Sequence, residues 1–235
     1  MNYFERFRDV GLVKDMLKEI INFQENVKIM EICGTHTRAF FESGLHDILP
    51  VNISLISGPG CPICVTSQRY IDTAIELAGR EEVIIVTFAD LIRVPGKNSS
   101  LQQNKADGGN IRVVHSPLEV VKIAERNPDD EIVFLAVGFE TTAPIIALSI
   151  MEAEKLNLKN YFILLSIKTM PPIIEELLLD KELKIDGFIC PGHVSTIIGS
   201  QPFNFIAEKH GLPATIAGFE RVDIIMALPE IINMI

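Results

Sequence analysis

Short apolar runs, each ending in a turn that contains glycine or proline, constrain the fold of this chain more than any other feature. Most are followed by a helical pattern, and they lie at residues 27–32, 53–56, 83–88, 111–114, 132–137, 161–167, 188–190 and 213–217. Short strands that alternate with helices predict an α/β fold with mostly parallel sheets. Because the runs are continuously apolar, we expect helices on both faces of each sheet.

These strands fall into two series, which predicts two Rossmann-like halves. We expect the first to span residues 1–109 and the second residues 110–235, with the break near Gly108 and Gly109. The unusual residues follow the carboxyl ends of predicted strands, which is the edge where open α/β sheets bind ligands. An opening helix is also predicted, and its apolar positions recur at helical spacing at Val13, Met16, Leu17, Ile20 and Ile21.

Charge and hydropathy exclude several classes of protein. The 235 residues include 21 basic and 31 acidic side chains, which gives a formal net charge of −10. No cluster of Lys and Arg stands out, so we predict no nucleic-acid partner. No apolar run approaches the roughly 18 residues of a membrane span, and residues 1–10 lack the apolar core of a signal peptide. We therefore expect a cytoplasmic protein without a membrane partner.

Two of the four cysteines form a C-x-x-C motif at residues 61–64, directly after a Gly-Pro-Gly turn and at a predicted helix start. Two thiols at this spacing form a disulfide or bind one metal ion, and a helix N-terminus lowers the pKa of a nearby thiol. The preceding turn indicates a rigid loop, which favours a functional role for Cys61 and Cys64. We interpret the lone Cys190 as a small buried side chain.

The third cysteine begins the sequence Cys33-Gly34-Thr35-His36. A thiolate and an imidazole at this spacing can face one metal ion, and Thr35 offers a hydroxyl for hydrogen bonds to a bound group. Taken together with Cys61 and Cys64, these residues supply four ligands suited to a zinc site or an iron site. Because the two pairs end strands of a parallel sheet, we favour a functional site over a structural one.

Two further strand-end turns hold candidate binding residues. Glu140 follows a strand and is a candidate for hydrogen bonding or proton transfer, and Thr141 and Thr142 could cap the next helix or contact a ligand. His193 lies in the turn Pro-Gly-His, where a backbone hydrogen bond is the alternative to ligand binding. Motifs for ATP, NAD and serine-hydrolase chemistry are absent from the sequence.

The end of the chain carries an apolar helical pattern. It consists of Ile224, Ile225, Leu228, Ile231, Ile232 and Ile235. An apolar helix face needs a partner that buries it. We therefore expect either a protein interface here or further chain in longer relatives.

Four stretches of the chain resemble the HypD family of maturation factors for nickel–iron hydrogenases. They are residues 30–37 (MEICGTHT), 57–66 (SGPGCPICVT), 136–144 (AVGFETTAP) and 191–195 (PGHVS). Residues 93–96 (RVPG) and 217–220 (AGFE) agree as well. The resemblance covers the chain from Gly11 to its end, with the motifs in order and at similar spacing.

The resemblance implies a fold, a function and a set of partners. The fold would be two Rossmann-like domains whose motif loops face a shared cleft. The function would be the assembly of an iron atom that carries cyanide and carbon monoxide, with a HypC-like chaperone and a HypE-like cyanide donor. By position, Cys33 would anchor the iron beside His36, and Cys61 and Cys64 would form a redox-active dithiol.

The sequence also departs from the family pattern. The family continues into a cysteine-rich region that binds a 4Fe–4S cluster, but no cysteine follows Cys190 here, so the cluster ligands are absent and we expect no cluster-binding C-terminal domain. Arg38 stands where the family usually has a second histidine, Ala89 where it has glycine, and Arg221 where it has proline.

Two other functions remain open from the residues alone. One is a thiol–disulfide oxidoreductase that uses Cys61 and Cys64. The other is a zinc-binding module that holds the metal with Cys33, His36, Cys61 and Cys64.

Overall fold

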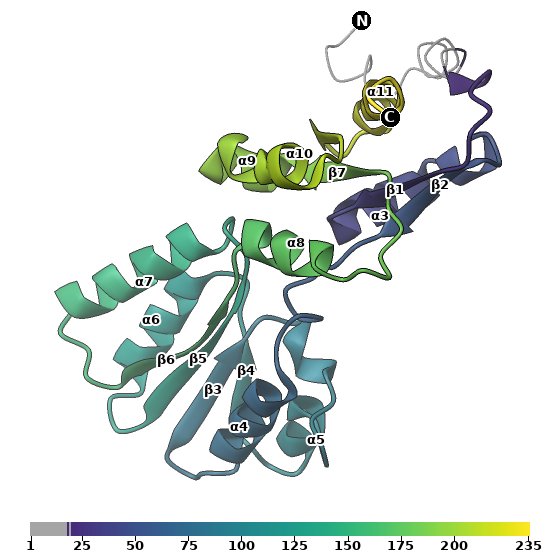
Figure 1. Ribbon diagram of the computed structural model, residues 1–235. Coiled ribbons are helices and arrows are strands. Elements are labelled where there is room, and N and C mark those ends of the chain that lie inside the picture. Colours follow the sequence, from purple (N-terminus) through teal and green to yellow (C-terminus); the bar gives the residue numbers. More distant parts are fainter. Residues whose placement is uncertain (1–17, 19) are drawn as a thin grey trace, which may run out of the picture. The chain divides into compact units, whose positions relative to one another are not determined.

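The computed structural model describes residue 18 and residues 20–235 of the chain (Figure 1). By the density of their contacts, these residues divide into two compact units. The described part of unit 1 lies within Met1–Cys61 and Thr169–Ile235, and unit 2 comprises Pro62–Lys168. Each unit contains one four-stranded sheet.

Unit 1 is built on a parallel sheet with the strand order β2-β1-β7-β8. Its strands are β1 (Val27–Glu31), β2 (Ile53–Ser57), β7 (Gly187–Pro191) and β8 (Ala214–Ala217). Its helices are α3 (Gly34–Glu42), α8 (Met170–Leu178), α9 (Gly192–Ile198), α10 (Phe205–His210) and α11 (Arg221–Ile232), with short 3-10 turns at Leu45–Asp47 and Gln201–Phe203.

Unit 2 repeats this plan with the strand order β4-β3-β5-β6, again all parallel. Its strands are β3 (Val83–Thr87), β4 (Ile111–Val113), β5 (Glu131–Gly138) and β6 (Tyr161–Ile167). Its helices are α4 (Gln68–Ala78), α5 (Leu101–Ala106), α6 (Pro117–Arg126) and α7 (Ala143–Lys155), with a 3-10 turn at Leu91–Arg93.

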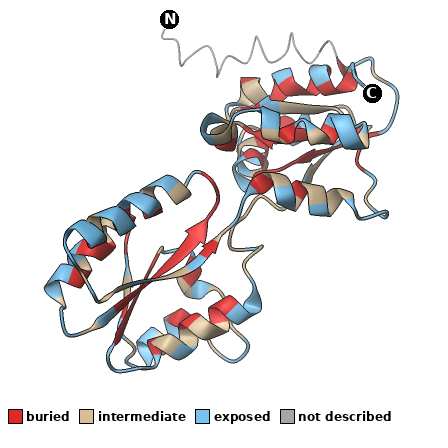
Figure 2. Ribbon diagram, turned by 60° about the vertical axis from the view of Figure 1, so that its left-hand side comes forward, coloured by how far each residue is buried: buried red, intermediate tan, exposed pale blue. Residues whose placement is uncertain are grey.

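The strands are continuously apolar because helices cover both faces of the sheet in unit 2. Within β3, Val83 and Ile85 pack into one buried cluster, while Ile84 and Val86 pack into another. Successive side chains of a strand point to opposite faces, so the two clusters lie on opposite sides of the sheet. Figure 2 shows the buried residues concentrated on the strands and on the helix sides that face them.

Serine side chains begin several of the helices. Ser67 caps α4, Ser100 caps α5 and Ser116 caps α6, each accepting a hydrogen bond from a backbone N–H of the first turn. Pro117 occupies the first position of α6, where a missing N–H costs nothing. These caps satisfy donors that the helix itself leaves unpaired.

The predicted fold class is confirmed, but the division of the chain differs from the prediction. All eight predicted strands are present within one or two residues of their expected bounds. The predicted break near Gly108 and Gly109 falls inside unit 2, between β3 and β4, which pair with each other. The chain instead returns to the first sheet with β7 and β8, because parallel crossovers allow strands distant in sequence to pair.

The two chain ends bear on two further predictions. The predicted opening helix lies mostly outside the described residues. The apolar face of the C-terminal helix, for which an interface or further chain was expected, is mostly buried within unit 1, because α11 packs into the core with Ile224, Ile225, Leu228, Ile231 and Ile232 buried. A helix that is apolar on nearly all sides is a core helix. Ile235 is exposed.

Across residues 18 and 20–235, none of the helices has the length and apolar character needed to cross a bilayer.

Candidate functional site

The motif loops of unit 1 meet at the carboxyl edge of its sheet. Cys33 lies two residues beyond the end of β1, and Gly58 directly follows β2. Gly192 begins α9 directly after β7, and Gly218 directly follows β8. Because parallel strands end at the same edge, four sequence motifs that are far apart along the chain are brought together there.

Cys33 stands at the N-terminus of α3. It is the N-cap residue, with an extended backbone, and its side chain is 4% exposed. The carbonyl oxygen of Cys33 accepts the N–H groups of His36 and Thr37, which closes the first turn. The thiol therefore lies beside the positive end of the helix dipole, in a position that stabilises negative charge.

The C-x-x-C motif is not at a helix start, contrary to the prediction. Cys61 and Cys64 lie in a turn, and α4 begins only at Gln68, with Ser67 as its cap. The hydroxyl of Thr66 donates to the carbonyl oxygen of Pro62 and closes this turn. Cys61 is half-buried and Cys64 is exposed.

A close approach of two backbones brings the two thiol loops of unit 1 together. A methyl group at Gly60 would lie 2.1 Å from the carbonyl oxygen of Ile32 and 2.4 Å from Cα of Cys33. A Cα–Cβ bond measures about 1.5 Å and consecutive Cα atoms lie about 3.8 Å apart. Cα of Cys61 is therefore within about 8 Å of Cα of Cys33.

Glu31 is a buried carboxylate beside Cys33 that the sequence analysis missed. Its side chain is 3% exposed, and Oε2 accepts the backbone N–H of Cys33 at 3.3 Å. The hydroxyl of Thr37 donates to Oε1, and the hydroxyl of Ser57 adds a further hydrogen bond. Burial raises the pKa of Glu31, and these hydrogen bonds partly offset that effect. The sequence signal was a glutamate inside an otherwise apolar strand.

His36 is buried and held by the loop after β8. Its Nε2 lies 3.2 Å from the carbonyl oxygen of Ala217 and 2.8 Å from that of Gly218. Because a carbonyl oxygen only accepts, Nε2 carries the hydrogen, which leaves a lone pair on Nδ1. Nδ1 is buried and has no hydrogen-bond partner among the described residues. Burial lowers the pKa of His36, which favours the neutral imidazole that binds metals.

His193 joins this group through an aromatic ring. The rings of His36 and His193 both contact Phe219, with centroid separations of 4.7 Å and 5.0 Å. Gly192 allows this arrangement, because a methyl group there would lie 2.7 Å from the carbonyl oxygen of Ala217. Sequence motifs from β1, β7 and β8 therefore form one packed cluster in unit 1.

The remaining predicted residues are distributed between the two units. Thr35 is an exposed residue in the first turn of α3, in unit 1. Cys64, Glu140, Thr141 and Thr142 belong to unit 2. Glu140 is buried after β5, Thr141 is exposed, and the first turn of α7 starts at Thr142.

The predicted capping role of the two threonines before α7 is not observed. Thr142 is the N-cap residue of α7, but its side chain makes no capping hydrogen bond. Its side chain instead contacts the backbone at Gly138, where a methyl group would lie 2.6 Å from Cβ of Thr142. The loop is thus shaped by this contact and by the carbonyl oxygen of Phe139, which accepts the N–H groups of Thr142 and Ala143.

Cys190 lies in the core. It belongs to β7, is 1% exposed, and burial raises the pKa of its thiol to about 12. A buried neutral thiol behaves as a small hydrophobic side chain, as predicted from the sequence.

Among residues 18 and 20–235, no group of three or more His, Cys, Asp or Glu side chains lies close enough together to hold a metal ion. Cys33 and the Nδ1 lone pair of His36 are the donors that unit 1 offers at the end of β1.

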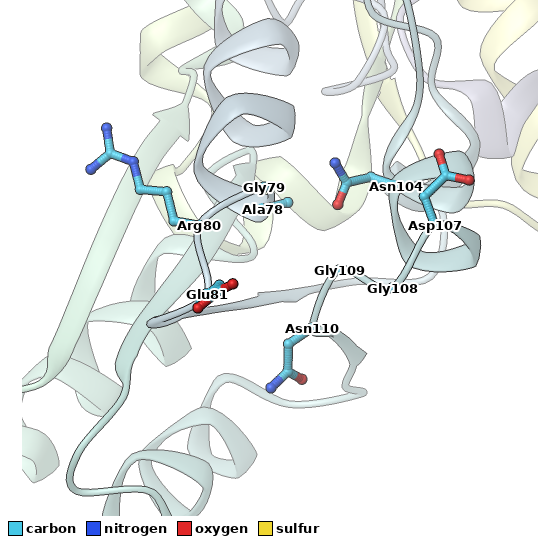
Figure 3. Close-up of a pocket in the computed structure, with 9 residues that line it drawn as sticks. All are labelled: Ala78, Gly79, Arg80, Glu81, Asn104, Asp107, Gly108, Gly109 and Asn110. Atoms are coloured by element: carbon cyan, nitrogen blue, oxygen red, sulfur yellow. The ribbon is translucent and has the colours of Figure 1, made fainter.

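A cavity in unit 2 lies away from all of the predicted residues. It has a volume of about 470 Å³ and is lined by Ala78, Gly79, Arg80, Glu81, Asn104, Asp107, Gly108, Gly109 and Asn110. In Figure 3, Asn104 and Asp107 extend from α5 on one side and Arg80 from the end of α4 on the other. Since these residues precede β3 and β4, the cavity lies at the amino edge of the sheet, where none of the motif loops lies.

Known proteins similar to this chain are hydrogenase maturation factors. It is 44% identical over 243 residues to the hydrogenase maturation factor HypD of Rhodobacter capsulatus, covering 100% of this chain and 64% of that protein. The same factor of Rhizobium leguminosarum bv. viciae is 42% identical over 245 residues, with the same coverages of 100% and 64%. That of Escherichia coli (strain K12) is 42% identical over 207 residues, covering 88% and 56%.

The chain thus spans less than two thirds of the length of these relatives. The family model described as "HypD: Hydrogenase formation hypA family" matches residues 11–235. That match includes every motif loop of both units, and the chain therefore belongs to the HypD family.

Proposed function

We propose that the chain is a hydrogenase maturation factor, and that it serves as a scaffold on which an iron atom with cyanide and carbon monoxide ligands is assembled. The names of its relatives support the first part. The observation that carries the second part is the packing of Gly60 against the backbone of Cys33, which brings the loops of two thiols together at one sheet edge.

Cys33 is the proposed anchor for the iron. Its thiol is buried, which limits the access of water and oxidants, and it lies at the start of α3, where negative charge is stabilised. His36 is its proposed neighbour in the site. The carbonyl oxygens of Ala217 and Gly218 hold the imidazole in one orientation, in the way that backbone carbonyls orient metal-binding histidines.

Cys61 and Cys64 are the proposed redox pair. Their oxidation to a disulfide releases two electrons and two protons, so the reduced pair can keep the site reduced. The half-buried and exposed positions of the two thiols support this role, because a redox pair must reach its exchange partner. Thr35, Glu140, Thr141, Thr142 and His193 are proposed to contact the iron ligands or the donor that brings them.

The proposed partners are a HypC-like chaperone and a HypE-like cyanide donor, acting in the cytoplasm. The sequence has four cysteines, the last of which is Cys190, and the proposal concerns these alone.

Anaerobic iron loading in the presence of a HypC-like partner tests this function. Infrared bands of iron-bound cyanide and carbon monoxide are expected with the unmodified chain. Cys33→Ala is expected to abolish them, whereas the control Cys190→Ala, which changes a core thiol, keeps them. Bands that persist in Cys33→Ala would show that the anchor is assigned wrongly.

A thiol–disulfide oxidoreductase is the second candidate, favoured by the half-buried and exposed positions of Cys61 and Cys64. A redox titration followed by thiol labelling separates the two functions. A reversible two-electron couple that Cys64→Ser abolishes, combined with no iron loading under any condition, would favour the oxidoreductase. The zinc module has no comparable support, since no three-ligand group is found in the described part of the chain.

A further inference from the structure

Glu31 holds together the chain segments that carry the two thiol loops of unit 1. Its buried carboxylate takes hydrogen bonds from the backbone N–H of Cys33 and from the hydroxyls of Thr37 and Ser57. These donors belong to three segments, namely the N-cap of α3, the first turns of α3, and the end of β2. All of these donors are neutral groups.

The hydroxyls link these segments to one another as well. Oγ1 of Thr37 lies 2.8 Å from Oγ of Ser57. The single hydroxyl proton of Thr37 is directed to Glu31, so in this contact only Ser57 can donate, and its one proton is shared between Oγ1 of Thr37 and the Glu31 carboxylate. Ser57 is the last residue of β2, so this chain of hydrogen bonds ends at the residue from which the Gly-Pro-Gly turn departs.

The main chain of Glu31 holds the same turn. Its carbonyl oxygen accepts the N–H of Gly58 at 2.8 Å, and a methyl group at Gly58 would lie 2.9 Å from that oxygen. The turn then continues along the backbone to Gly60, which packs against Cys33. Glu31 thus contacts the Cys33 loop with its carboxylate, and the loop before Cys61 with both its carboxylate and its carbonyl group.

We propose that Glu31 is a positioning residue that sets the separation of the Cys33 and Cys61 thiols, with Thr37 and Ser57 as its relays. This inference deepens the proposed function and rests on it only for the role that the two thiols serve. A carboxylate suits this position because it accepts several hydrogen bonds at once and donates none. A glutamine of the same shape would place an N–H₂ group against donors and leave at least one of them unpaired.

Cadmium binding measures the separation of the thiols without iron or partner proteins. In a Cys64→Ser background kept reduced with a phosphine, Cd²⁺ is expected to bind both Cys33 and Cys61. The thiolate-to-cadmium absorption band per bound ion then reports two sulfur ligands. A Cys61→Ser variant of the same background gives the amplitude for a single sulfur.

Glu31→Gln is expected to lower the band toward the single-sulfur amplitude and to weaken cadmium binding about tenfold, the order of effect of one lost hydrogen bond to a charged group. The matched control is Glu42→Gln, which removes an exposed carboxylate at the end of α3 that pairs with Arg38. It is expected to keep both the amplitude and the affinity.

A pair of threonine variants separates position from charge and from misfolding. Thr37→Ser keeps the hydroxyl group and is expected to keep the two-sulfur band. Thr37→Val removes the hydroxyl group and is expected to lose that band. Neither substitution changes the charge of the chain. Two-sulfur binding that survives in both Glu31→Gln and Thr37→Val would overturn the proposal. A two-sulfur band that depends on Glu31, in a chain that never forms infrared-active iron, would overturn the proposed function alone.

Discussion

Gly60 offers a sharp test of how the two thiol loops of unit 1 are held. In Gly60→Ala, the new methyl group would lie 2.1 Å from the carbonyl oxygen of Ile32 and 2.4 Å from Cα of Cys33, whereas ordinary contacts begin near 3.4 Å. Both neighbours are backbone atoms at the end of a buried strand, so they cannot rotate away. The loop that carries Cys61 must therefore retreat by about 1 Å or more.

This displacement of the loop is expected to lower the stability of the fold and to impair metal binding at the two thiols more strongly. Forcing an extra carbon into packed structure costs about 1–3 kcal/mol, and a shift of about 1 Å in a ligand set can cost about a hundredfold in function. We expect the free energy of unfolding of Gly60→Ala, obtained from urea titration, to fall by about 1–3 kcal/mol, and its cadmium complex to show a single-sulfur band. Circular dichroism is the suitable probe of unfolding, because the chain has no tryptophan.

Gly34→Ala is the matched control for this experiment. Gly34 directly follows Cys33, and a methyl group there would meet no atom within 4 Å. We expect this variant to match the unmodified chain in stability and in cadmium binding. The reasoning would be refuted by a Gly60→Ala protein with unchanged stability and an intact two-sulfur band.

Three further predictions follow from the site and its core. His36→Leu leaves the carbonyl oxygens of Ala217 (buried) and Gly218 (half-buried) without their donor, so a loss of about 1–3 kcal/mol in the free energy of unfolding is expected from urea titrations. Between about pH 9 and pH 12 the thiol of Cys190 loses its proton in the unfolded chain but keeps it in the folded chain. The free energy of unfolding therefore falls as pH rises, by about 1.4 kcal/mol per pH unit. Cys190→Ala is expected to remove this pH dependence and to leave the pH dependence of stability near neutral pH unchanged. Iodoacetamide is expected to modify Cys64 in the native protein and to leave Cys190 unmodified until the chain unfolds, as peptide mass spectrometry would show.

The strands were predictable because each is marked locally. A continuously apolar run that stops at glycine or proline needs no information from elsewhere in the chain, and β3 and β5 illustrate this. The partition into units was not predictable in the same way. Nothing in the residues at 61–62 or 168–169 signals that β7 and β8 pair back onto the sheet of β1, since any two parallel strands can be joined by a crossover.

The candidate site was predictable as a set of residues but not as a set of contacts. The motifs placed Cys33, His36 and His193 after strands; in the structure Cys33 lies just beyond β1, and the two histidines lie in the first turns of α3 and α9, the helices that follow β1 and β7. The contact of both histidines with Phe219 joins residues that lie far apart in sequence, and no periodicity reports it. Glu31 was overlooked because a single acid in a strand carries no signal until its three donors are seen around it.

The error over the C-x-x-C motif shows how local competition decides where a helix starts. Glycine, proline and cysteine before an apolar run predict a helix start. The helix instead begins after the residue whose side chain best accepts hydrogen bonds from the backbone N–H groups of the first turn. Ser67 does so by accepting the N–H of Tyr70, and cysteine is a poor acceptor by comparison. Cys33 occupies the N-cap position of α3 without a capping hydrogen bond from its side chain. Its backbone N–H donates to Glu31, and its own carbonyl oxygen accepts the N–H groups that close the first turn. The thiol of Cys33 is therefore left unused by the fold at the start of a helix, which is the condition that a ligand-binding cysteine requires.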